Sequence, residues 1–265
     1  MKKKILFVID SLGIGGAEKS LVSLLGLLDY SRYEVDLQLF AYQGSFQRFL
    51  PEKVRILPPL NYTRFLMLPV WRQVCHPSML LARLRYSLTI RCSMMSHAEM
   101  AVAYWRNIGQ CISRNPRQYD VAIAYAQGIP TFYVADKISD FKKIRWVNAC
   151  YRLSESARDY QRKFYEECNF IVPVSEIVRN VFSETCPEFT NKMYVVRDII
   201  NAESLKAMSK FVCDKKIDHF YPILMTVGGL DKLTKGYDLA LEAAKVLKNR
   251  KIKFKLCNRR GTISQ

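Results

Sequence analysis

Closely spaced glycines near the start of the chain have the types and spacing that could bind a phosphate. The apolar run Ile5–Ile9 is followed by Gly13, Gly15 and Gly16, just before apolar residues at helical spacing. The pattern predicts a strand, a glycine-rich turn and a helix. Free backbone N–H groups at such a helix N-terminus suit an anion. The alternative is a tight turn of any α/β domain, and one motif does not decide between them.

A second turn of the same kind occurs near the end of the sequence. The apolar residues 222–227 are followed by Gly228 and Gly229, and residues 236–247 have helical apolar spacing. A further strand is expected at 252–256, which predicts a second βαβ unit.

Strand and helix patterns alternate between these two turns. Further strands are expected at 33–40, 54–57, 119–126, 143–147, 170–174 and 194–197. Alternation of this kind predicts an α/β fold with a parallel sheet covered on both faces. Ligands of such sheets bind at the carboxyl ends of the strands. That edge would carry the loops at 11–16, 126–130 and 148–152, and residue 175.

A nicotinamide or flavin enzyme is disfavoured by two details. The first turn reads SLGIGGAE instead of GxGxxG, and the strand at 33–40 ends in Phe40 and Ala41. An acidic residue that binds the ribose would be expected there.

The charge indicates an anionic partner. The 265 residues carry a net charge of +17, and residues 62–117 hold eight arginines, no lysine and one acid, Glu99. Arginines interleaved with apolar residues can lie on an anionic bilayer. The alternative is a pair of core-packed helices with a solvated basic face. No signature of a nucleic-acid-binding domain is present. The residues expected to face the membrane are Arg64, Arg72, Arg83, Arg85 and Arg91.

Cysteine spacing and hydropathy indicate the compartment. None of the eight cysteines lies within four residues of another, so the sequence has no CxxC redox pair and no metal knuckle. Scattered cysteines fit a reducing environment. The first apolar run is shorter than the core of a signal peptide. We therefore expect a cytoplasmic protein, located peripherally at the inner face of the membrane.

Several segments, in this order, resemble family 4 glycosyltransferases. They are SLGIGGAEKSLVSLL, YDVAIAYAQGIPT, WVNACY, IVPVSEIVRNVF and VGGLDKLTKGYDLALEAAKVL. The resemblance implies a GT-B fold, with a complete N-terminal Rossmann-like domain on the acceptor side and the first βαβ unit of a second Rossmann-like domain. On this basis residues 1–197 form the first domain, 198–220 the linker and 221–265 the start of the donor domain.

The resemblance also implies an activity. A sugar would move from a nucleotide-sugar donor, with retention of configuration, to a lipid-linked or polysaccharide acceptor in synthesis of cell-surface glycans. The resemblance implies no obligatory metal and no other cofactor, so protein charge must stabilise the leaving diphosphate. The residues implied for this role are Gly15, Gly16, Gly228, Gly229 and Lys235.

Three departures from the family pattern bear on activity. Gly229 replaces an arginine, and Asn148 and Cys150 replace a histidine and an aspartate. The paired glutamates that hold the donor sugar would lie beyond residue 265, so we expect a C-terminally truncated member. The alternatives are an inactive truncated glycosyltransferase and a peripheral membrane-binding module without catalysis.

Overall fold

The computed structural model describes the chain except for residues 93, 140–141, 151–152, 211–220, 229–235 and 260–265. Contacts within the chain divide it into two compact units, Met1–Ser204 and Leu205–Gln265. Residues 198–204 belong with the first unit, in which Ser20 Oγ donates a hydrogen bond to Asp198 Oδ1 at 2.6 Å.

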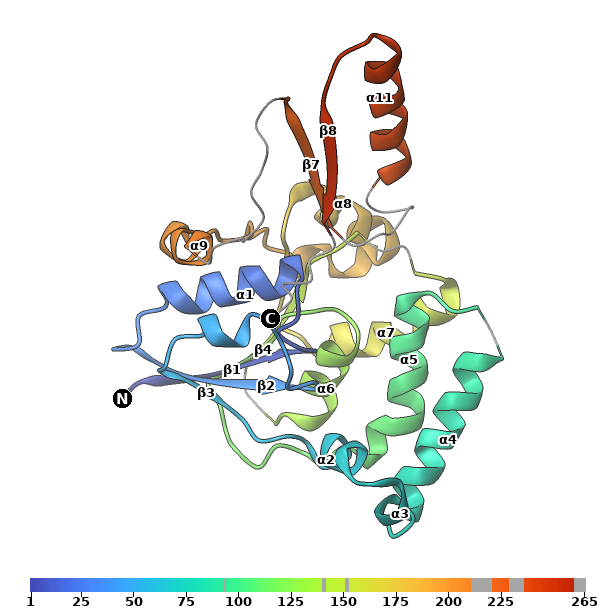
Figure 1. Ribbon diagram of the computed structural model, residues 1–265. Helices are drawn as coiled ribbons and strands as arrows, with labels where there is room; N and C mark the ends of the chain where they lie inside the picture. Colours follow the sequence, from blue (N-terminus) through green and yellow to red (C-terminus); the bar gives the residue numbers. More distant parts are fainter. Residues whose placement is uncertain (93, 140–141, 151–152, 211–220, 229–235, 260–265) are drawn as a thin grey trace. The chain divides into compact units, whose positions relative to one another are not determined.

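The first unit is built on a six-stranded sheet whose neighbouring strands are all parallel. The strand order is β3-β2-β1-β4-β5-β6 (Figure 1). The strands are β1 (Lys3–Ile9), β2 (Tyr33–Leu39), β3 (Val54–Ile56), β4 (Val121–Ala124), β5 (Lys142–Val147) and β6 (Phe170–Pro173). The parallel sheet predicted from the alternating pattern is confirmed.

Strand β1 lies between β2 and β4 and is buried on both faces. Leu6 and Val8 belong to the core on one face, whereas Phe7 and Ile9 belong to the core on the other. A continuous apolar run is what a parallel strand covered on both sides requires.

Helices cover both faces of this sheet. Leu21 of α1 (Gly16–Leu27) packs in the same core as Phe7. On the other face, Leu6 shares its core with side chains of α5 (His97–Ile108), α6 (Ile129–Lys137) and α7 (Glu155–Glu166). The remaining α-helices of this unit are α2 (Asn61–Met67), α3 (Val70–Gln73), α4 (Pro77–Arg91), α8 (Glu176–Thr185) and α9 (Ala202–Ser209), the last of which crosses the unit boundary. The short 3₁₀ helices are Gln47–Phe49, Gly109–Cys111 and Pro187–Lys192.

The strand predicted at 194–197 is wrong. The segment follows the edge of β6, where the Tyr194 amide donates to the Ile171 carbonyl at 2.9 Å and the Val196 amide to the Pro173 carbonyl at 3.1 Å. Tyr194 and Val196 are both exposed, so the segment has no face that burial could hold in a regular ladder.

The second unit contains the predicted βαβ arrangement. Strands β7 (Ile223–Val227) and β8 (Lys255–Arg259) are parallel and are joined through α11 (Tyr237–Asn249). Strand β8 begins later than predicted, because Ile252 closes the helix end. Its amide donates to the Leu247 carbonyl, and Lys251 adopts a left-handed φ of 57°, as in a Schellman motif.

The second unit has little apolar burial. Helix α11 has no buried residue, and its Leu239, Leu241 and Val246 are exposed. Since the described part of this unit has a sheet of only two strands and little buried apolar surface, we expect it to open locally far more often than the first.

Hydrogen exchange should therefore separate the two units. Amides of β7, β8 and α11 should exchange at least about a hundredfold faster than those of β1, because their opening exposes less apolar surface. Equal protection of α11 and β1 in native-state hydrogen exchange would contradict this expectation.

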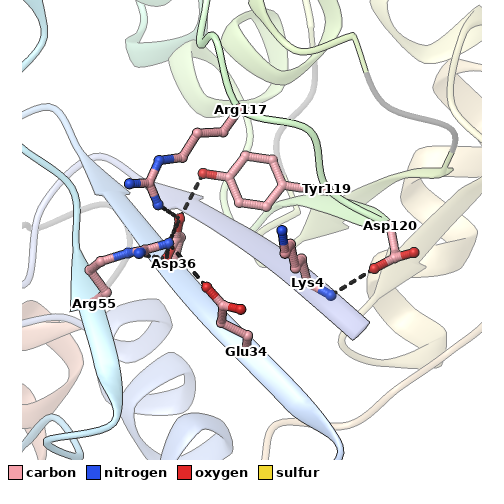
Figure 2. Close-up of polar contacts among 7 residues, drawn as sticks. All are labelled: Lys4, Glu34, Asp36, Arg55, Arg117, Tyr119 and Asp120. Carbon is pink, nitrogen blue, oxygen red and sulfur yellow. Dashed lines mark hydrogen bonds and ion pairs between the residues drawn. The ribbon is translucent and has the colours of Figure 1, made fainter. Parts of the chain in front are cut away.

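A compact cluster of charged side chains lies on the sheet, toward the amino-terminal ends of its strands (Figure 2). Asp36 of β2 is only 1% exposed, and its carboxylate accepts hydrogen bonds from Arg55, Arg117 and Tyr119. Arg55 Nη2 also contacts Glu34 at 3.3 Å. The cluster connects β2, β3 and the segment before β4, so all of the Asp36 charge is compensated by protein.

Substitution of Asp36 should destabilise the first unit. Asp36→Ala should lower the free energy of unfolding by about 2–3 kcal/mol, less than for a fully buried pair because both arginines are half exposed. Urea unfolding of the two proteins measures the difference. The matched control Glu34→Gln removes a half-exposed pair and should change the unfolding free energy by less than about 1 kcal/mol.

Candidate functional site

The carboxyl edge of the six-stranded sheet contains the point at which the strand order reverses. Strand β1 lies beside β2 on one side and β4 on the other, so the loops that follow β1 and β4 diverge. Ligands of open parallel sheets bind in the crevice formed there. The loops after β1, β4 and β5, at 10–15, 125–128 and 148–150, lie at this edge. Ser175, also predicted there, follows β6 and caps α8, where its Oγ accepts a hydrogen bond from the Val178 amide at 3.2 Å.

Asp10 is the first residue of this edge. It follows Ile9, and its carbonyl accepts hydrogen bonds from the amides of Phe40 at 3.0 Å and Ala41 at 2.8 Å. Burial raises the pKa of its carboxyl to about 7, and the charge of Glu18 raises it further in the same direction. A carboxyl whose pKa lies near neutral pH at the end of a central strand is a candidate functional group. The sequence signal for this residue is the charged side chain that ends the apolar run Ile5–Ile9.

The glycine-rich turn brings Glu18 back over its own helix terminus. Gly15 caps α1 with an extended backbone, φ −156°, and a Cβ on it would collide with the Glu18 carboxylate. Burial raises the pKa of Glu18, and its own backbone N–H opposes that shift. Gly15 has no backbone strain, and a side chain at this position would require the flexible Glu18 carboxylate to move. An anion that binds Gly15 and Gly16 must displace this carboxylate.

Asn148 lies at the same edge, directly after β5. Its Nδ2 donates to the Tyr125 carbonyl at 2.6 Å, and its amide donates to Gln127 Oε1 at 3.2 Å. Its Oδ1 is buried and has no hydrogen-bond partner among the described residues. A buried acceptor without a partner carries a free-energy cost, which a ligand hydroxyl could remove.

Two stacked aromatic side chains connect the strands that carry these loops. The ring of Tyr125 stacks on Trp146 with centroids 4.7 Å apart, and its hydroxyl lies 2.9 Å from Ser20 Oγ. Because Ser20 belongs to α1, the contact fixes that helix against β4 and β5. The helix that begins at Gly16 is thereby tied to the strand that Asn148 follows.

Three of the five residues predicted for the donor phosphates lie in the other unit, namely Gly228, Gly229 and Lys235. Gly228 follows β7, and its carbonyl accepts a hydrogen bond from the Tyr237 hydroxyl at 3.0 Å. Gly229 and Lys235 lie outside the described residues. Their role in binding the diphosphate stays a prediction.

The five arginines predicted to face a membrane lie on three successive helices. Arg64 is in α2, Arg72 in α3, and Arg83, Arg85 and Arg91 are in α4. All are exposed except Arg83, which is partly buried and donates a hydrogen bond to Gln73 Oε1. None of the helices in the described part of the chain is both long and apolar enough to cross a bilayer.

A pocket of about 490 Å³ lies between α4, α5 and α7. Glu99 closes one side, where its Oε1 accepts a hydrogen bond from Ser154 Oγ at 2.7 Å. The lining combines apolar and polar groups, a composition that suits an amphiphilic ligand. It includes Met94, Met95, Val102, Arg106 and Asn107. Sequence reasoning missed this pocket, because its residues come from segments that are distant in the chain.

The pKa of Asp10 can be tested by NMR titration of its carboxyl carbon. We expect a value near 7, and a lower value in Glu18→Gln that stays above the ordinary 3.8, because burial is the larger cause. Since the pKa is raised in the folded state, the contribution of Asp10 to stability is complete below pH 3.8 and is lost as the pH rises through about 7. Asp10→Asn should therefore gain stability relative to wild type over that range. An unshifted pKa near 4 would contradict the burial argument.

Comparison with solved structures supports the fold. No family model and no curated protein matches the sequence. Anabaena HepE in complex with UDP is similar to this chain with a TM-score of 0.50 and 13% identity, over 99% of this chain and 70% of HepE. A glycosyltransferase from Rickettsia africae has a TM-score of 0.48 and 13% identity, over 99% of this chain and 69% of its own. At such identity the likeness to HepE concerns the fold alone. The chain has an α/β fold of the GT-B type.

Proposed function

We propose that this protein is a glycosyltransferase that takes a sugar from a nucleotide-sugar donor. The observation that carries the proposal is the carboxyl edge of the sheet, where Asp10 follows β1 and where Asn148 Oδ1 has no partner among the described residues. The HepE structure of similar fold was solved with UDP. A sugar or ribose hydroxyl would supply the donor that Asn148 Oδ1 lacks.

Asp10 would contribute through its protonation state. With a pKa near 7 its carboxyl is partly protonated at neutral pH, so it can both donate and accept a hydrogen bond with a ligand hydroxyl. The first turn of α1 would bind a phosphate once Glu18 moves away. For Gly228, Gly229 and Lys235 of the second unit, the resemblance likewise implies a role in binding a donor phosphate.

The remaining assignments follow the sequence resemblance. We propose membership of family 4, a retaining reaction without an obligatory metal, and a lipid-linked or polysaccharide acceptor for a cell-surface glycan. The pocket between α4, α5 and α7 is the proposed acceptor site, because Met94 and Val102 offer apolar contact beside the polar Glu99 and Asn107. The protein would act at the cytoplasmic face of the membrane.

The test is transfer of radiolabelled sugar from common nucleotide sugars to isolated membranes. Asn148→Ala should lower the transfer rate by about tenfold, the value of one hydrogen bond to the reacting complex. Glu34→Gln at the amino edge of the sheet is the matched control and should leave the rate unchanged.

Two results would contradict the proposal. One is the absence of transfer from any of these donors while a glycosyltransferase of similar fold is active in the same assay. The other is an unchanged rate in Asn148→Ala. Lack of transfer together with retained membrane binding would favour a binding module without catalysis.

A further inference from the structure

Helix α4 is apolar on both of its sides. On its inner side, Ala82 is buried and the ring of Tyr86 packs edge-to-face on Tyr104 of α5 at 5.5 Å. On its outer side, Leu84 is 53% exposed and Leu88 is 62% exposed. A surface helix normally has a polar outer side, so the outer leucines of α4 require another explanation than core packing.

The neighbouring helices also carry exposed apolar side chains. In α3, Val70 is 77% exposed and Trp71 is 69% exposed. Figure 1 shows α2, α3 and α4 following one another along one side of the first unit. We call the exposed side chains of these helices the outer apolar face, which comprises Met67, Val70, Trp71, Leu81, Leu84 and Leu88.

A buried glutamine holds these helices in a fixed arrangement. Gln73 is buried, its Nε2 donates to the Leu68 carbonyl at 2.8 Å, and its Oε1 accepts a hydrogen bond from Arg83. The segment after α2, helix α3 and helix α4 are thus linked through one side chain. The exposed apolar residues are therefore presented by a fixed scaffold.

Arginines lie among the exposed apolar residues. Helical spacing places Arg85 and Arg91 on the same side of α4 as Leu84 and Leu88. The guanidinium of Arg72 lies 4.7 Å from the ring centroid of Trp71. No aspartate or glutamate occurs from residue 53 to residue 98, so the charge of this surface is positive throughout.

We propose that the outer apolar face docks on a bilayer containing anionic lipids. The leucines and Trp71 enter the boundary between headgroups and acyl chains, while the arginines contact the headgroup phosphates. This deepens the proposed function by naming where its lipid-linked acceptor is met. The pocket between α4, α5 and α7 is lined in part by Thr89, near the end of α4, and therefore lies close to the docked surface.

Vesicle flotation in the absence of any nucleotide sugar tests the docking alone. The wild-type chain should float with phosphatidylcholine vesicles that contain phosphatidylglycerol, and much less with phosphatidylcholine alone. Added salt should weaken the binding. Replacing Leu84 and Leu88 together by asparagine should lower the partition coefficient by about tenfold or more, from the lost apolar burial.

The charge contribution is tested by a second variant and a control. Replacing Arg85 and Arg91 together by glutamine should weaken binding about tenfold or more and reduce its salt dependence. The control Leu27→Asn changes an exposed leucine of α1, outside this face, and should float like wild type. Because all of these side chains are exposed, circular dichroism should show unchanged folding.

The docking proposal is overturned if wild type does not float, if the paired leucine variant floats equally well, or if neutral vesicles bind equally. Self-association that depends on Leu88, without flotation, would assign the face to a second copy of the chain and would also overturn it. Flotation without sugar transfer would leave this proposal standing and count only against the proposed function.

Discussion

Burial of β1 on both faces is the constraint on which the rest of the first unit depends. Its apolar side chains alternate between two cores, and each core requires helices on its own side of the sheet. With β1 fixed between β2 and β4, the loops after β1 and β4 must diverge at the carboxyl edge. The position of Asp10 and of the glycine-rich turn follows directly from this arrangement.

Polar side chains differ in how far the protein compensates them at the amino and the carboxyl ends of the parallel strands. At the amino edge, the carboxylate of Asp36 receives hydrogen bonds from two arginines and a tyrosine, so the group is compensated within the protein. At the carboxyl edge, Asp10 has a raised pKa and Asn148 retains an acceptor without a partner among the described residues. Compensated groups stabilise a fold, whereas groups left uncompensated mark the place where a ligand is expected.

Much of the fold could be predicted from local patterns. The apolar run Ile5–Ile9, its glycine-rich turn and the later strands follow from periodicity, because parallel strands with two covered faces need continuous apolar stretches. The strand predicted at 194–197 was wrong because the exposed Tyr194 and Val196 do not pack into a core, as the side chains of a covered strand do. The late start of β8 depends on the helix end at Lys251, which propensity alone does not indicate.

The site was less predictable than the fold, because its chemistry depends on contacts between distant segments. The raised pKa of Asp10, the Asn148 oxygen without a partner among the described residues, and the pocket beside Glu99 all arise from tertiary packing. The glycines could be singled out by spacing, but the return of Glu18 over Gly15 could not. A helix terminus that looks open in sequence is occupied by its own side chain.

The most direct test of the carboxyl-edge site is the map of backbone amide shifts that UDP causes in the NMR spectrum of the chain. UDP should shift the amides of Gly13 to Glu18, Gln127 and Asn148, which surround the switch point. Shifts confined to residues around Asp36 and Arg117 at the opposite edge, or no shifts at saturating UDP, would contradict the account.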